Sequence, residues 1–392
     1  MLHAVAADLD DRGAWQVYLD WLLEREDPRA ELFRLQVSLE DADDEREAKE
    51  LATQIAALLD QHGETWLAGV QALKLPVHWG MHRGVVGRVT GSPTKLAASA
   101  RKILDAAPLL MSVQLDVSQR DLSPLAGSPL LARARELTIH GDSKRLTGWQ
   151  HVIAPEVRSL ELASLSFAAE DLAALVAQPW PKLEVLELSG CSFNKRAIVP
   201  LAKLVAPNLV RFDLAAGHLG APLGEVLAAL PELRYLRIPG NELGGDALAL
   251  LRPKLGQLSY LDLRGNALAG ADIAPLLQAL RHVTVLKLGS NTLGTEAVEQ
   301  IAAWPGAQRL TWLDVAFDSE RGARAIARST QLSLALARLS LGMSRLTPAL
   351  EHELLDAPRL ANARIYAGKM LGRKKREAEL AASAIRKKKV TR

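Results

Sequence analysis

A pair of apolar residues recurs along most of this chain and constrains its fold more than any other feature. Two apolar residues separated by one position return every 23 to 27 residues. Weaker copies at Val86/Arg88 and Ala363/Ile365 extend the series at its two ends. A fixed period of this length predicts a solenoid, because units that cannot bury their apolar side alone stack into one core. The pairs are Val113/Leu115, Leu137/Ile139, Leu160/Leu162, Leu186/Leu188, Phe212/Leu214, Leu236/Ile238, Leu261/Leu263, Leu286/Leu288, Leu313/Val315 and Leu339/Leu341.

The middle repeats carry a longer pattern. Residues 233–243, 258–268 and 283–293 fit L-x-x-L-x-L-x-x-N-x-L, with valine at the first position of the third copy. This pattern resembles the leucine-rich repeat, and the Leu-Gly with a small-residue helix after residue 293 is similar to the ribonuclease-inhibitor type. The resemblance covers about residues 83 to 366. It implies an α/β solenoid of 11 or 12 repeats with a curved parallel sheet inside and helices outside.

The asparagine position of each repeat turns the chain away from its strand. Its amide can bond backbone groups of the turn, and successive copies build a ladder along the solenoid. Leu165 and Gly217 cannot supply an amide, so we expect irregular turns there. Cys191 is expected to be a small buried ladder residue rather than a reactive thiol. The ladder comprises Ser118, Asp142, Leu165, Cys191, Gly217, Asn241, Asn266, Asn291, Asp318 and Ser344.

Composition bounds the class of protein. The chain has 392 residues, of which 48% are apolar, and it contains no run of 18 apolar residues that could span a membrane. The start of the chain lacks a basic segment and reaches an acid at Asp8, so we expect no signal peptide. One cysteine excludes an internal disulfide framework. These features favour a cytoplasmic protein.

Residues 1–75 do not share the repeat period and indicate a helical module. They resemble the small repeat-companion domain that precedes leucine-rich-like repeats in some bacterial proteins, a family for which no activity is implied. Trp15, Tyr18, Leu19, Leu22 and Leu23 form the predicted apolar face, with exposed ion pairs and a capped turn at Asp27-Pro28. The alternative is a binding site at Asp20, Glu24, Glu31 and Arg34. The matching residues are Tyr18, Asp20, Trp21, Leu22, Glu24, Arg25, Asp27, Pro28, Arg29, Glu31, Arg34 and Gln36.

Motifs for catalysis are absent from the sequence. It contains no P-loop, no G-x-S-x-G, no G-x-G-x-x-G, no H-E-x-x-H and no paired C-x-x-C. His78 and His82 are four residues apart, but Gly80, Gly84 and the valines that follow argue against a helix, and no third ligand is near in sequence. We therefore expect no catalytic residue, no metal and no cofactor, and an enzyme within the helical module is only a third hypothesis.

The residues between and beside the apolar pairs face the predicted concave surface. Glu161, Glu187 and Asp213 fall on consecutive strands, where three carboxylates repel one another unless a cation meets them. Aromatics beside charges on a rigid sheet favour recognition of an unidentified protein partner. A solvated sheet face is the alternative. The expected binding residues are Glu161, Glu187, Asp213, Tyr235, Arg237, Tyr260, Asp262, Lys287 and Trp312.

The last segment is strongly basic. Ten Lys and Arg from Lys369 onward stand against two Glu, a charge of +8, which leaves 3 − 8 = −5 for the rest of the chain. This segment could be a solvated end, a nonspecific nucleic-acid or anionic-surface binder, or an arm that lies in the acidic concave groove. The predicted domains are thus a helical module at 1–75, the solenoid at 76–367 and a basic tail at 368–392. The candidate anion-binding residues are Arg373, Lys374, Lys375, Arg376, Arg386, Lys387, Lys388 and Lys389.

Overall fold

The computed structural model describes residues 2–40, 42, 45–117, 120–315, 319–342 and 346–371. The chain divides into two compact units, Met1–Phe193 with Lys203–Leu209, and Asn194–Ala202 with Val210–Arg392. Each unit contains repeats of a strand followed by a helical segment. The fold is an α/β solenoid with a mostly parallel sheet, as the sequence predicts. The domain boundaries at residues 75 and 367 stay predictions.

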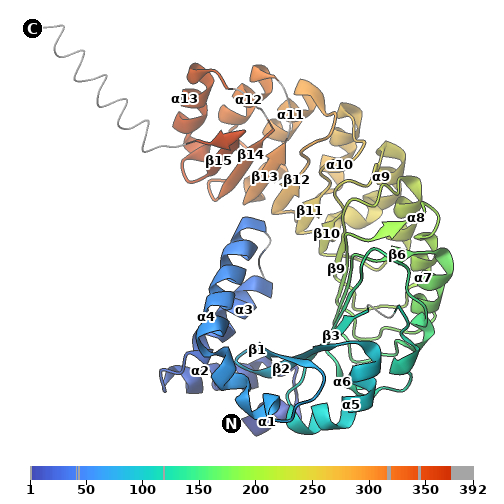
Figure 1. Ribbon diagram of the computed structural model, residues 1–392. Helices are drawn as coiled ribbons and strands as arrows, with labels where there is room; N and C mark the ends of the chain where they lie inside the picture. The colour runs from blue at the N-terminus through green and yellow to red at the C-terminus, as the bar shows by residue number, and fades with distance from the viewer. Residues whose placement is uncertain are drawn as a thin grey trace, which may run out of the picture. The chain divides into compact units, whose positions relative to one another are not determined.

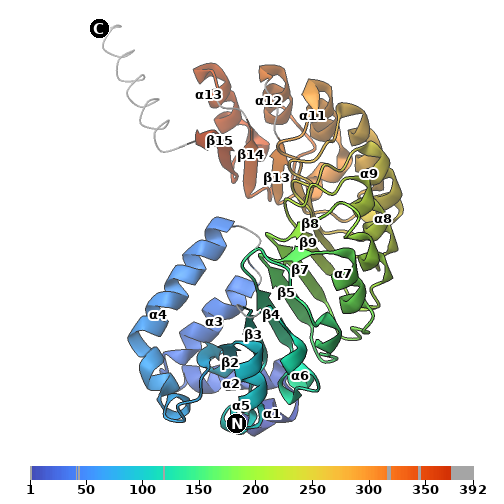
Figure 2. The ribbon, with the colours of Figure 1, turned by 45° about the vertical axis from the view of Figure 1, so that its right-hand side comes forward.

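The first unit begins with helices that the apolar pattern places. Trp15, Tyr18, Leu19 and Leu22 are buried as predicted, whereas Leu23 is 37% exposed and does not belong to the apolar face. Asp27 accepts from the backbone and side chain of Arg29, which confirms the capped turn. Helices α3 and α4 pack side by side (Figure 2). The helices of this region are α1 (Leu2–Ala7), α2 (Arg12–Leu23), α3 (Arg29–Glu40) and α4 (Glu45–Gln71).

The N-terminal helices share a core with the first repeats. Trp15, Phe33, Val85 and Met111 belong to one cluster of buried residues. The Tyr18 hydroxyl donates to the Gly84 carbonyl oxygen at 3.2 Å. These contacts join segments far apart in sequence, so burial of this core couples the helices to the strands that follow.

Strands of the first unit pair in repeat register. A hairpin of β1 (His78–His82) and β2 (Val85–Gly91) precedes parallel β3 (Ser112–Asp116), β4 (Glu136–His140), β5 (Ser159–Ala163) and β7 (Val185–Ser189). Val89 pairs with Val113 and Gly91 with Leu115, so the first copy was misplaced at Val86/Arg88. A small second sheet joins β6 (Ser166–Phe167) and β8 (Ser192–Phe193). The helices are α5 (Pro93–Ala106), α6 (Pro129–Arg133) and α7 (Ala169–Val176).

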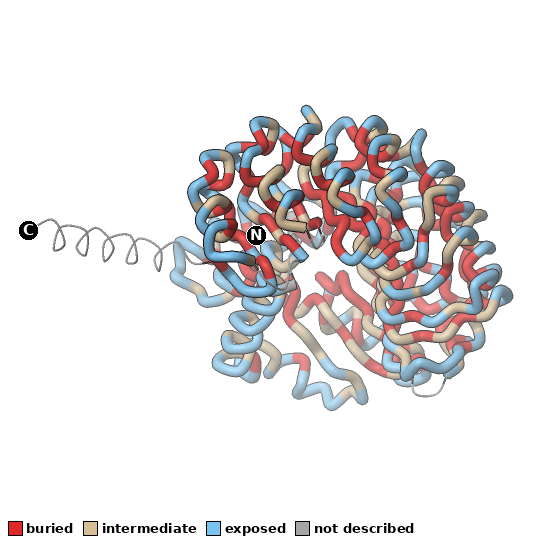
Figure 3. Tube along the Cα trace, turned by 90° about the horizontal axis from the view of Figure 1, so that it is seen from above, coloured by how far each residue is buried: buried red, intermediate tan, exposed pale blue. Residues whose placement is uncertain are grey.

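In the second unit, helices lie along one side of the parallel strands (Figure 1). Buried and exposed stretches alternate along the repeats (Figure 3). The last register aligns Leu339 with Ile365 and Leu341 with Ala367, so the copy at Ala363/Ile365 was two residues early. The strands are β9 (Arg211–Leu214), β10 (Tyr235–Arg237), β11 (Tyr260–Asp262), β12 (Val285–Lys287), β13 (Trp312–Val315), β14 (Arg338–Leu341), β15 (Arg364–Ala367) and antiparallel β16 (Lys369–Met370). The helices are α8 (Ala221–Ala229), α9 (Gly245–Leu251), α10 (Ile273–Ala279), α11 (Gly294–Ala303), α12 (Glu320–Ala327) and α13 (Pro348–Asp356).

The asparagine ladder is present in the second unit. Asn241 Nδ2 donates to the Leu214 carbonyl oxygen at 2.7 Å, and Asn266 Oδ1 accepts from the backbone N–H groups of Asn241 and Leu243. Gly217 has no side-chain amide, and its backbone N–H donates to Asn241 Oδ1. Residues 216 and 218 on either side of it both have positive φ, but so do Gly240 and Glu242 on either side of Asn241. The turn at Gly217 therefore repeats the backbone of the regular turn, and the expected irregularity is not seen there.

The ladder positions Cys191 and Asp142 differ in burial and in role. Cys191 is buried, and its Sγ lies 3.1 Å from the Leu162 carbonyl oxygen, as a ladder donor would. Burial raises the pKa of the Cys191 thiol to about 11, which agrees with the predicted structural role. Asp142 is exposed and pairs with Lys144, so it does not act as a ladder residue. Ser118, Asp318 and Ser344 lie outside the described residues.

Candidate functional site

We term one face of the second unit's strands the strand face. It carries the residues that flank the buried apolar pairs. Two rows of side chains cross it because the parallel strands stay in register. The aromatic row comprises the first residues of β9, β10, β11, β13 and β14, which are Arg211, Tyr235, Tyr260, Trp312 and Arg338. The charged row comprises the residues between the apolar pairs of β9 to β13, which are Asp213, Arg237, Asp262, Lys287 and Asp314.

Cations and rings alternate along the aromatic row. The Arg211 guanidinium lies 4.0 Å from the centre of the Tyr235 ring, and Tyr235 stacks on Tyr260 with ring centroids 4.0 Å apart. At β12 the row position is a valine, and Lys287 Nζ fills the gap. It donates to the Tyr260 hydroxyl at 2.7 Å and lies 3.3 Å from the centre of the Trp312 ring. Arg338 covers Trp312 at 4.8 Å. Such contacts fix the orientation of each ring.

Charges alternate in the charged row. Arg237 Nη1 lies 3.0 Å from Asp213 Oδ1, and Arg264 Nη2 lies 2.7 Å from Asp262 Oδ2. Burial opposes the charge of Arg237, but Asp213 and Asp262 outweigh it and raise the pKa of Arg237. Burial also raises the pKa of Asp314, against the attraction of Arg264. The carboxylates on this face are therefore balanced by neighbouring guanidinium groups.

The sequence pattern placed these residues on one face but did not predict how deeply they are buried. Tyr260 is 3% exposed, Asp262 0% and Lys287 2%, so these three are part of the packed sheet surface rather than projecting anchors. Tyr235 and Trp312 are partly exposed. The row is thus a packed surface on which two large aromatic residues are partly exposed.

The acidic residues predicted on consecutive strands divide between the units. Glu161 and Glu187 are register partners in the first unit. Burial, then the Glu187 charge, raises the pKa of Glu161, although Thr138 Oγ1 lies 3.4 Å from its carboxylate. Asp213 belongs to the second unit and pairs with Arg237. The Glu187 charge therefore adds to the effect of burial on the pKa of Glu161, and Asp213 has a cation beside it.

The other predicted sites have mixed outcomes. Asp20 accepts a hydrogen bond from Gln16, and Glu24 lies 3.7 Å from Arg25. Among the described residues, no ion pair joins Asp20, Glu24 or Glu31 to Arg34. The candidate anion-binding residues of the tail, Arg373 to Lys389, lie outside the described residues. Lys369 Nζ lies 3.1 Å from a Glu351 carboxylate oxygen.

His78 and His82 lie on a strand, as the glycines around them predicted. The expectation that no further ligand lies near His82 is wrong in three dimensions. Glu40 and Glu136 approach it, and one ligand atom of each of the three residues lies within 4.8 Å of the others. Burial lowers the pKa of His82, with the two carboxylates opposing that effect.

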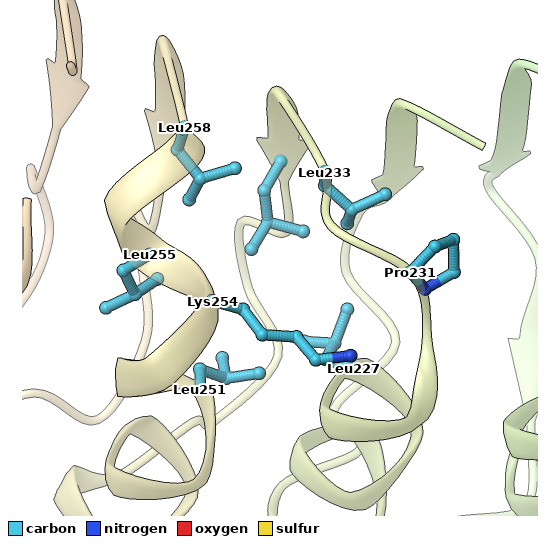
Figure 4. A pocket seen from close by; sticks show the side chains of 8 residues that line it. Leu227, Pro231, Leu233, Leu251, Lys254, Leu255 and Leu258 are labelled. Carbon is cyan, nitrogen blue, oxygen red and sulfur yellow. The ribbon is translucent and has the colours of Figure 1, made fainter. Parts of the chain in front are cut away.

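One apolar gap lies between α8, α9 and the segment that follows α9 (Figure 4). Leu227, Leu251 and Leu255 line it, and Lys254 Nζ donates to the Leu230 carbonyl oxygen at the end of α8. The gap has a volume of about 10 Å³, which is room for no more than about one water molecule. It is a packing gap between repeats, and Lys254 caps a helix there.

Sequence reasoning left three cations out of the candidate site: Arg211, Arg264 and Arg338. Arg211 and Arg338 share the column of Tyr235 and Trp312, and that shared position is the signal that identifies them. Arg264 directly follows the apolar pair Leu261/Leu263, two residues after Asp262, and that spacing is the signal for its place beside Asp262.

Comparisons with known proteins add little. No family model matches the chain, and no curated protein matches it in sequence. A solved structure of an internalin from Listeria monocytogenes str. 4b F2365 is similar at 18% identity and a TM-score of 0.43, covering 70% of this chain and 69% of that one. The α/β solenoid fold is established by the strand register and the asparagine ladder of this chain itself. Among the described residues, no helix has the length and apolarity needed to cross a membrane.

Proposed function

We propose that this protein is a noncatalytic scaffold that binds a protein partner through the strand face. The observation that carries the proposal is the aromatic row, in which partly exposed Tyr235 and Trp312 are each flanked by an arginine. Tyrosine, tryptophan and arginine are the residues most enriched among those that dominate binding energy at protein interfaces. Their fixed stacking reduces the conformational entropy lost on binding.

The finer identity of the chain is part of the same proposal. The L-x-x-L-x-L-x-x-N-x-L pattern and the ladder at Asn241, Asn266 and Asn291 support repeats of the ribonuclease-inhibitor type. The polar and aromatic series between Tyr18 and Gln36 supports a bacterial repeat-companion module, which would stabilise the first repeats through their shared core. The buried cysteine supports a cytoplasmic location.

An affinity experiment tests the binding role. Full-length protein, a truncation lacking residues 373–392 and a Tyr235→Ala/Trp312→Ala double variant are compared as baits at moderate salt. A matched control carries Leu250→Ala on α9, where that side chain is 49% exposed.

A protein retained by the wild type, the truncation and Leu250→Ala, but lost from the double variant, supports recognition by the strand face. Nucleic acid retained only when the tail is present, and lost at high salt, supports the alternative that the basic tail binds anionic surfaces. A partner retained by all four baits contradicts the role of the aromatic row.

A further inference from the structure

Three residues distant in sequence converge within the first unit. Glu40 ends α3, His82 ends β1 and Glu136 begins β4. The His82 Nε2 atom lies 3.5 Å from Glu136 Oε1, and Glu40 offers an oxygen within 4.8 Å of both ligand atoms. The cluster lies outside the strand face, and neither the repeat core nor the proposed partner-binding surface requires it.

His82 is unusual among the side chains of this region. It is a titratable side chain that is only 3% exposed, and its Nε2 lies 3.5 Å from Glu136 Oε1. A buried polar group ordinarily has a polar partner of this kind. The Gly87 backbone approaches the base of this side chain closely, because a Cβ on Gly87 would lie 2.9 Å from His82 Cβ. The buried imidazole has one nitrogen near both carboxylates.

We propose that Glu40, His82 and Glu136 bind a divalent transition-metal ion of the zinc class. Zinc binds histidine nitrogen and carboxylate oxygen at about 2.0–2.2 Å, which puts neighbouring tetrahedral ligands roughly 3.4 Å apart. The 3.5 Å distance between His82 Nε2 and Glu136 Oε1 is close to that ligand–ligand distance. Glu40 needs a small movement, which its position at the exposed end of α3 permits. Three protein ligands leave one coordination position open.

Charged groups of both signs surround the imidazole, since Glu40 and Glu136 attract a cation there and Arg83 and Arg88 oppose it. Two carboxylates face one imidazole, and Arg83 Nη2 lies 2.6 Å from one oxygen of Glu40. The second Glu40 oxygen remains for the ion.

Zinc and cobalt titrations of the full-length protein test the site. Isothermal titration calorimetry measures zinc affinity, and visible absorption of bound Co²⁺ reports its coordination geometry. We expect binding of one ion per chain, displacement of cobalt by zinc, and affinity weakened by about tenfold or more in Glu40→Gln and in His82→Asn. His78→Asn is the matched control, because His78 lies at the other end of β1 and is exposed.

Substitution of His82 in the core could prevent folding. Glu40→Gln keeps the test decisive in that case, since Glu40 is at a helix end. Circular dichroism establishes that each variant is folded before titration. Equal zinc affinity in the wild type, Glu40→Gln and His82→Asn would overturn the proposal, as would loss of affinity in His78→Asn alone. Absence of zinc binding by the wild type would overturn it directly.

Discussion

Removal of the Asn266 amide should destabilise the second unit far more than removal of an exposed asparagine amide. Asn266 is 6% exposed, and its Oδ1 accepts from the N–H groups of Asn241 and Leu243 at 3.2 and 3.0 Å. Its Nδ2 donates to the Ile238 carbonyl oxygen at 2.9 Å. Asn266→Ala leaves these three backbone groups without that partner. At about 1–3 kcal/mol for each buried group left unsatisfied, the three groups give an expected loss of unfolding free energy of roughly 3–9 kcal/mol.

Asn362→Ala is the matched control in the same unit. Asn362 is exposed, and its Nδ2 lies 3.4 Å from the Leu334 carbonyl oxygen, so the expected loss is below about 1 kcal/mol. Urea unfolding followed by circular dichroism measures the two losses. Because repeat arrays can unfold in parts, hydrogen exchange at the Asn241 and Leu243 amides is measured as well. Equal losses in the two variants, or unchanged exchange at those amides in Asn266→Ala, would refute the ladder argument.

Three further predictions concern single side chains. Burial raises the folded-state pKa of Glu161, so the stability that the protonated side chain contributes at low pH is lost as the pH rises from about 4.5 through that raised pKa. Unfolding experiments should therefore find Glu161→Gln more stable than the wild type at pH 7 and equal to it at low pH. A similar gain in Glu225→Gln, at an exposed side chain, would contradict this. The Cys191 thiol, with its pKa of about 11, should react with a maleimide at pH 8 only as fast as the protein unfolds, and rapid labelling of folded protein would show that it is accessible. Tyr18→Phe should lose about 0.5–1.5 kcal/mol in denaturant unfolding, because a buried hydroxyl donates to a backbone carbonyl there, whereas Tyr366→Phe, at a side chain 48% exposed, should be neutral.

Much of the fold was predictable because the repeat determines it locally. The apolar pair fixes which strand residues are buried, and parallel register then follows from stacking one repeat on the next. The prediction failed at the two ends, where Val89 and Ile365 are the aligned residues. End repeats have a neighbour on one side only, so their sequence departs from the pattern that neighbours impose.

The sequence predicted which face of the strands carries the candidate site, but not how deeply its residues are buried. Strand alternation placed Tyr260 and Lys287 on the strand face, yet it carries no information on lateral packing. A lysine that bends across a valine position to meet two rings depends on distances between strands, not on sequence spacing. For the same reason, the approach of Glu40 and Glu136 to His82 could not be predicted, because the three residues are separated by 42 and 54 positions.

Photo-crosslinking in living cells tests the central proposal, partner binding by the strand face, most directly. A photoreactive phenylalanine analogue replaces Tyr235 on the strand face or Leu250 on α9, which is 49% exposed, and crosslinked proteins are identified by mass spectrometry. We predict that one protein crosslinks from position 235 and not from position 250, and that Trp312→Ala weakens that crosslink. Crosslinks from position 250 alone, or equal crosslinks from both positions, would contradict recognition through the strand face.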